Sequence, residues 1–100
     1  MRVILAKPKS GKTLALIHKS ASEGGYIVCM NMAEARRVHE EARRRGVDIP
    51  FPLTFDEFVF GRYHAKGIKR LYIDNLDQCL QAHSSIPIDV VTLQAPRKKS

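Results

Sequence analysis

The chain has 100 residues, of which 44% are apolar and 27% charged, and its formal net charge is +7. This length predicts one small domain. No apolar run could span a bilayer, and the run at residues 3–5 is too short for a secretory signal. We therefore expect a cytoplasmic protein without a membrane partner. The basic balance favours a polyanionic partner, either a nucleic acid or a nucleotide.

Residues 6–13 read Ala-Lys-Pro-Lys-Ser-Gly-Lys-Thr, between a predicted strand at residues 2–5 and a predicted helix at about residues 11–22. A tight turn followed by a helix N-terminus presents backbone N–H groups to phosphates, so this pattern is typical of a phosphate-binding loop. Lys12 would reach the β- and γ-phosphates, and Thr13 would offer its hydroxyl to Mg²⁺. Ala6 replaces the usual first glycine, which we interpret as a tolerated variant. The predicted nucleotide-binding residues are Lys7, Pro8, Lys9, Ser10, Gly11, Lys12, Thr13 and Leu14.

Residues 26–30 form a continuous apolar run, which is typical of a parallel strand covered on both faces. Asn31 follows as a helix N-cap with Glu34 three residues later, and the predicted helix continues to Arg45. Its outer side and end are arginine-rich, which leaves open two interpretations, a solvated helix face or a DNA-binding patch. The residues concerned are Arg36, Arg37, Arg43, Arg44 and Arg45.

After a connector at residues 47–53, Thr54 is predicted to cap a short helix that ends near residue 63, with Glu57 reaching back to the cap. Residues 69–74, Lys-Arg-Leu-Tyr-Ile-Asp, are predicted to form a strand with an apolar part that ends in Asp74. This is the Walker B pattern, in which the carboxylate holds Mg²⁺ beside the phosphates. Asn75 is predicted to cap the next helix.

That helix should turn Leu76, Cys79, Leu80 and His83 inward, and a fourth strand is expected at residues 88–93. The order of elements predicts a three-layer α/β/α domain with a minimal four-stranded parallel sheet. We expect a compact nucleotide-binding domain at residues 1–95 and a basic tail at residues 96–100. The ligand should lie at the carboxyl ends of the strands, with Asn31 and Gln94 close by.

The order of motifs resembles the first RecA-like half of superfamily 1 helicases, within the P-loop NTPases. Residues 10–13 look like motif I of that family, and residues 30–35 look like its motif Ia. Residues 54–58 are similar to its Thr-Phe-His-Ser-Phe segment. Residues 72–75 stand at its Walker B position, and residues 91–94 stand at its motif III. The resemblance implies a strand order one, four, three, two, with Mg²⁺ and ATP as ligands. Residues 1–35 also resemble small P-loop ATPases of bacteriophages, which implies a viral protein acting in the host cytoplasm.

One departure bears on hydrolysis. The family has glutamate directly after the Walker B aspartate to polarise the attacking water, and this chain has Asn75, which is a poor base. Glu57 or Asp77 are candidate substitutes. These 100 residues show no second RecA-like half, and we therefore expect an arginine finger to come from a partner or another subunit.

Two functions follow from these patterns. The first is an ATP-binding domain with weak or partner-dependent hydrolysis, accessory in DNA metabolism, with Lys12, Asp74 and Asn75 as the catalytic positions and Thr13 and Asp74 on the metal. The second is a non-catalytic module on a degenerate fold, binding nucleic acid or protein through basic residues. These would be the arginines above with Lys66, Lys69, Arg70 and the tail.

Overall fold

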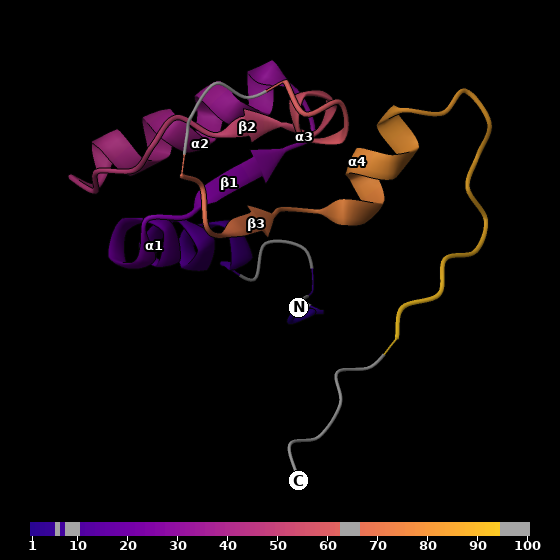
Figure 1. Cartoon of the computed structure of the whole chain (residues 1–100), viewed down its shortest axis with the longest axis horizontal. Coiled ribbons are helices and arrows are strands. Elements are labelled where there is room, and N and C mark those ends of the chain that lie inside the picture. The colour runs from indigo at the N-terminus through magenta and orange to yellow at the C-terminus, as the bar shows by residue number, and fades with distance from the viewer. Residues whose placement is uncertain (6, 8–10, 63–66, 95–100) are drawn as a thin grey trace, which may run out of the picture.

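The computed structural model describes residues 1–5, 7, 11–62 and 67–94. Helices and strands alternate along most of this length (Figure 1). In chain order they are α1 (Lys12–Glu23), β1 (Tyr26–Cys29), α2 (Met32–Arg44), β2 (Leu53–Thr54), α3 (Phe55–Val59), β3 (Leu71–Ile73) and α4 (Leu76–Ala82).

The described residues form one sheet of three parallel strands in the order β2-β1-β3. Val28 pairs with Leu53 on one side of β1 and with Ile73 on the other. β1 is therefore the central strand, which explains why its sequence is apolar without alternation: both of its faces are covered. The chain belongs to the general α/β class.

The two faces of the sheet are packed against different helices. Ile27 and Cys29 of β1 lie with Tyr72 of β3 in a cluster that contains Ile17 of α1 and Val38 of α2. On the opposite face, Val28 packs with apolar residues of α3 and α4, which include Phe55, Phe58, Cys79 and Leu80. The sheet is thus a middle layer between two pairs of helices.

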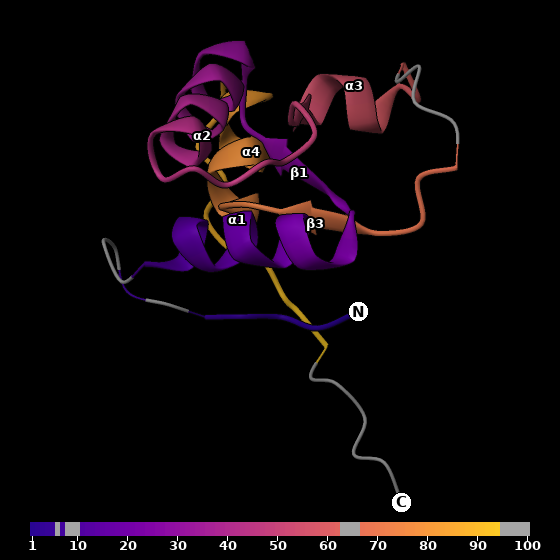
Figure 2. The ribbon, with the colours of Figure 1, turned by 90° about the vertical axis from the view of Figure 1, so that its left-hand side faces the viewer.

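The predicted four-stranded sheet and its strand order are wrong. Neither residues 2–5 nor residues 88–93 form a strand, and both segments are largely exposed: Leu5 is 86% exposed and Val90 is 75% exposed. Figure 2 shows the N-terminal segment running apart from the sheet and the chain after α4 leading away from the body. Strand propensity depends on pairing and packing, and neither segment pairs with the sheet.

β2 is a strand that the sequence did not predict. Leu53 and Thr54 belong to the segment interpreted as a connector and cap, yet they pair with Val28 and Cys29. Two residues are too short for an alternation pattern to be read. Leu53 and Thr54 form a strand because they lie beside β1 and pair with it, which their own sequence does not indicate.

The predicted helix starts have mixed outcomes. The Asn31 cap is confirmed, since its side chain accepts a hydrogen bond from the backbone N–H of Glu34 at 2.9 Å. The capping box of Thr54 and Glu57 is also confirmed, although α3 ends earlier than expected, at Val59. Asn75 stands at the N-cap position of α4 as predicted, but the expected side-chain cap is absent: Asn75 makes no cap hydrogen bond, and its backbone is left-handed, with φ of 55°.

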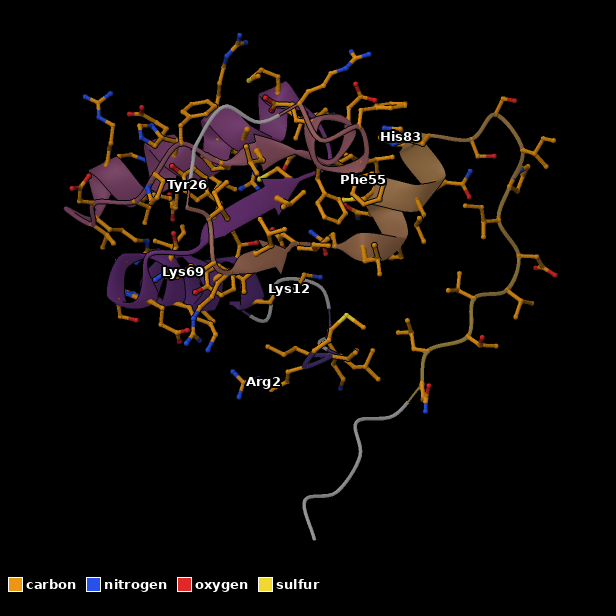
Figure 3. The ribbon with its side chains drawn as sticks, viewed as in Figure 1. Arg2, Lys12, Tyr26, Phe55, Lys69 and His83 are labelled. Atoms are coloured by element: carbon orange, nitrogen blue, oxygen red, sulfur yellow. The ribbon has the colours of Figure 1, made fainter. Side chains whose placement is uncertain are left out.

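The packing of α4 differs from the prediction at Leu76 and His83, which were expected to face inward and are both exposed. Cys79 is buried as expected, but Leu76 is 37% exposed. His83 lies at the end of α4 with its ring against that of Phe55 from α3, at a centroid separation of 5.2 Å (Figure 3). These contacts tie α3 and α4 together on their face of the sheet.

The amino end of the sheet is closely packed. Gly25, directly before β1, is buried, and a Cβ placed on it would lie 2.5 Å from the ring of Tyr72. Ser20 Oγ donates to the Gly25 carbonyl oxygen at 2.6 Å. Glu23 forms ion pairs with Lys19 at 2.9 Å and with Arg70 at 2.7 Å. These contacts join α1 to β1 and β3.

Candidate functional site

Two side chains from distant parts of the chain meet at the carboxyl end of the sheet. Thr13 Oγ1, in the first turn of α1, donates a hydrogen bond to Asp74 Oδ2, directly after β3, at 3.0 Å. The two residues are 61 positions apart in sequence. The structure therefore brings together the two residues that the sequence predicted as metal ligands.

The N-terminus of α1 differs from those of α2 and α3. Its N-cap is Gly11, with φ of 83°, and no side chain caps it; its first turn contains no acidic residue. A left-handed φ of this kind favours glycine. Lys12 is the first residue of the helix and is half-buried (Figure 3). The helix dipole therefore leaves a positive end at this point, and α1 itself supplies no carboxylate there; the carboxylate in contact with its first turn is that of Asp74.

Asp74 is fixed by the strand that carries it. Its backbone N–H donates to the Val28 carbonyl oxygen at 3.0 Å, which extends the β1–β3 ladder by one residue. Its carbonyl oxygen accepts a hydrogen bond from the Cys79 thiol at 3.5 Å. Asp74 is only 6% exposed. The carboxylate is therefore held beside the start of α1 by β3 and α4 together.

The two cysteines near Asp74 are inert thiols. Burial, followed by the nearby charge of Asp74, raises the pKa of Cys29 to about 12 and that of Cys79 to about 11. The thiolate is the reactive form, so both side chains stay protonated and unreactive at neutral pH.

A small pocket opens beside Asp74, between the carboxyl ends of β1 and β3. Its volume is about 10 Å³, and its lining consists of the polar residues Glu34, Asp74, Asn75 and Gln78 together with Cys29 and Met30. The sequence interpretation missed Glu34 here, because a glutamate at the third position of a helix is typical of capping. Nothing in the sequence alone relates it to Asp74.

The remaining predicted residues have different positions. Leu14 is half-buried in α1, whereas Lys7, Asn31 and Gln94 are exposed. Gln94 lies in the irregular segment after α4, not at a strand end, so the expectation for it is wrong. Ala6, Pro8, Lys9, Ser10, Lys66 and the tail at residues 96–100 lie outside the described residues.

The proposed arginine patch on α2 is extensively ion-paired. Four of its arginines contact a glutamate one turn earlier on the same helix: Arg37 with Glu34, Arg43 with Glu40, and Arg44 and Arg45 with Glu41. All four arginine side chains remain about half exposed or more. Such pairs contribute little stability, but they lower the net positive potential of the helix surface.

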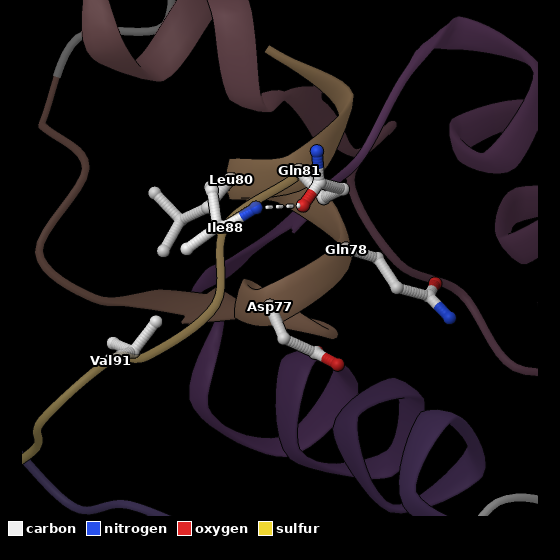
Figure 4. A pocket seen from close by; sticks show the side chains of 6 residues that line it. All are labelled: Asp77, Gln78, Leu80, Gln81, Ile88 and Val91. Carbon is white, nitrogen blue, oxygen red and sulfur yellow. Dashed lines mark hydrogen bonds between the residues drawn. The ribbon is translucent and has the colours of Figure 1, made fainter. Parts of the chain in front are cut away.

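A larger pocket lies between α4 and the segment that follows it (Figure 4). Its volume is about 320 Å³, and Asp77, Leu80 and Val91 are in its lining. Ile88 N donates to Gln81 Oε1 at 2.7 Å, which holds the segment near the helix. Asp77 lines this pocket and is absent from the lining of the small one beside Asp74.

The oxygen atoms at the Thr13–Asp74 contact fit Mg²⁺ in type, because this ion takes one or two protein oxygens and completes its shell with phosphates and water. Within the described ranges no group of three or more His, Cys, Asp or Glu side chains could hold a metal by itself. Across the same ranges, no helix has the length and apolar character needed to cross a membrane.

The chain was compared with models of protein families, with curated proteins and with solved structures, and none of the three comparisons gave a match.

Proposed function

We propose that this chain is a P-loop domain that binds ATP as its Mg²⁺ complex and hydrolyses it weakly or only with a partner. The observation that carries the proposal is the hydrogen bond from Thr13 to Asp74, because it joins the end of the Gly-Lys-Thr motif to the acid after an apolar strand. These two motifs are the ones that P-loop proteins use for phosphates and metal.

Three features support a phosphate site at this point. The uncapped start of α1 offers backbone N–H groups and the positive end of a dipole to an anion. Lys12 stands at that start, where its ammonium group adds a positive charge. The site lies at the carboxyl ends of parallel strands, where open α/β sheets bind their ligands.

We assign the residues of this site to phosphate binding and to metal binding. Lys12 and the loop amides bind the phosphates, and Thr13 and Asp74 hold Mg²⁺, which supplies charge neutralisation at the transferring phosphoryl group. Asn75 is a poor base, and an arginine finger would come from another protein or a second copy of the chain. Both points favour slow hydrolysis by the isolated chain.

The role in DNA metabolism is the part of the proposal that depends on charge. The net charge of +7 favours binding to a polyanion, although the pairing of the α2 arginines with glutamates reduces what that helix contributes. If DNA binds, its affinity should fall steeply with salt, because basic side chains release counterions. A flat salt response would remove this part and leave the nucleotide site in place.

The test of nucleotide binding is titration calorimetry with Mg·ATP on the whole chain and on Lys12→Ala, with single-stranded DNA present and absent. We expect the wild type to bind and Lys12→Ala to lose about 100-fold or more in affinity, equivalent to about 2.7 kcal/mol. Lys19→Ala is the matched control, since it removes a lysine from the other end of α1. Equal binding by wild type and Lys12→Ala would overturn the site.

A further inference from the structure

Two helices of the chain begin with the same pattern and use it differently. α2 begins after Asn31 with Glu34 as its third residue, and α3 begins after Thr54 with Glu57 in the same place. The Glu57 carboxylate returns to the cap: its Oε1 accepts from the Thr54 backbone N–H at 2.9 Å. Glu57 is therefore occupied in the capping box and is a poor candidate for chemistry.

The Glu34 carboxylate does not close a capping box. Its Oε2 accepts two hydrogen bonds from Arg37, at 3.1 Å from Nε and 2.8 Å from Nη2. Its Oε1 receives no hydrogen bond from the described part of the chain. Arg37 thus fixes the direction of the carboxylate through one oxygen and leaves the other oxygen available.

Glu34 also lines the small pocket beside Asp74. A volume of about 10 Å³ is the space of about one water molecule, and a buried water needs two to four polar partners. The carboxylates and the amides of Asn75 and Gln78 supply acceptors and donors of the right kind. Asn75 is available for this because its side chain does not cap α4.

From this arrangement we infer that Glu34 is the general base of ATP hydrolysis, in the role that Asn75 cannot fill; this inference rests on the proposed function. A water in the pocket attacks the γ-phosphorus, its proton passes to Glu34 Oε1, and a new P–O bond forms. The bond from the γ-phosphorus to the β–γ bridging oxygen breaks, and its electron pair leaves with ADP. The proton then passes to solvent, so the products are ADP, phosphate and one proton.

The other acids are less suited to this role. Glu57 is held in its capping box, and Asp77 lines the larger pocket between α4 and the segment after it, not the small pocket beside Asp74. Asp74 accepts the hydrogen bond from Thr13 and is assigned to the metal. Glu34 combines a fixed direction with an available oxygen at the sheet end where Asp74 lies.

The experiment measures Mg·ATP affinity by calorimetry and single-turnover phosphate release for wild type, Glu34→Gln and Glu40→Gln. Glu40 is the matched control, because it lies on the same helix, is exposed and pairs with Arg43. We expect Glu34→Gln to bind Mg·ATP within about threefold of wild type and to lose about 10²–10⁴-fold in release rate. Glu40→Gln should match wild type in both.

Other results separate the two proposals. Release by Glu34→Gln at the wild-type rate would overturn the assignment of Glu34 while nucleotide binding stands. Binding by wild type without any release, with and without DNA, would overturn it as well. Absence of Mg·ATP binding by wild type would overturn the proposed function itself. If Glu34→Gln does not fold, Glu34→Asp decides: an unchanged rate contradicts the assignment, and a reduced rate with unchanged binding supports it.

Discussion

The two ends of the parallel sheet are built from different contacts. At the amino end, Gly25 lies in close contact with the Tyr72 ring, and Ser20 donates a hydrogen bond to the Gly25 carbonyl oxygen. Glu23 of α1 forms an ion pair with Arg70, directly before β3. At the carboxyl end, the Asp74 carboxylate accepts a hydrogen bond from Thr13 beside a small polar pocket.

This difference separates stability from ligand binding. A closely packed end with satisfied hydrogen bonds loses free energy of folding when it is changed. At the carboxyl end, a carboxylate and an uncapped helix start present polar groups that can bind a ligand. These groups contribute less to the stability of the fold than to ligand binding. Variants of the amino end should therefore unfold more readily while they still bind the nucleotide. Variants of the carboxyl end should bind the nucleotide more weakly while their stability is retained.

The largest effect on stability is expected for Gly25→Ala. The added Cβ would lie 2.5 Å from Tyr72 Cε2, and Tyr72 is buried in the core, so its ring has little room to move. We expect the free energy of unfolding to fall by about 1–3 kcal/mol, measured by urea denaturation. Mg·ATP affinity should be unchanged under conditions in which the variant is folded.

A double-mutant cycle makes this prediction specific. Tyr72→Leu removes the ring that the new methyl group would meet, so Gly25→Ala should cost less in that background than in wild type. Additive losses would mean that the contact between Gly25 and Tyr72 is not the cause. A parallel loss of nucleotide affinity would mean that the two ends of the sheet are not independent.

The sequence predicted the elements whose signals are local. The Asn31 cap, the box of Thr54 and Glu57, and the buried strand at Tyr26–Cys29 depend on residue types a few positions apart. It also identified Thr13 and Asp74 as neighbours from the Gly-Lys-Thr and Walker B patterns, although the strand expected before Thr13, at residues 2–5, is not formed.

The predictions from sequence were wrong for strands whose formation depends on pairing between segments that are far apart in the chain. Residues 2–5 and 88–93 have the composition of strands but no partner in the sheet, whereas Leu53 and Thr54 lack a strand pattern and are paired. Glu34 was missed for a related reason: its helix position explains it completely until the fold brings it to the pocket of Asp74. Asn75 occupies the N-cap position that the sequence predicted, but its backbone is left-handed and its side chain makes no cap hydrogen bond.

At the carboxyl end, Asp74→Asn should weaken metal-dependent binding with little effect on stability. Asparagine retains an oxygen that can accept the hydrogen bond from Thr13, so the fold loses little. We expect wild type to bind ATP more tightly with Mg²⁺ than with a chelator, and Asp74→Asn to lose about 10-fold or more in the Mg²⁺-dependent part, measured by calorimetry. Asp77→Asn, a nearby exposed acid on α4, is the control and should match wild type.

The smallest effect is expected at the surface of the amino end, for Glu23→Gln. The hydrogen bond from Lys19, with the charges of Lys19 and Arg70, lowers the pKa of Glu23 below its ordinary value of 4.5. A lowered pKa in the folded state means that the contacts favour the charged form, so their contribution is present above pH 4.5 and is lost as the pH falls. At pH 7 Glu23→Gln should therefore have a slightly lower Tm than wild type, because exposed ion pairs contribute little. In melts recorded from pH 7 downward, the two Tm values should converge below pH 4.5. A difference that persists in acid would mean that packing by the Glu23 side chain, and not its charge, joins α1 to β3.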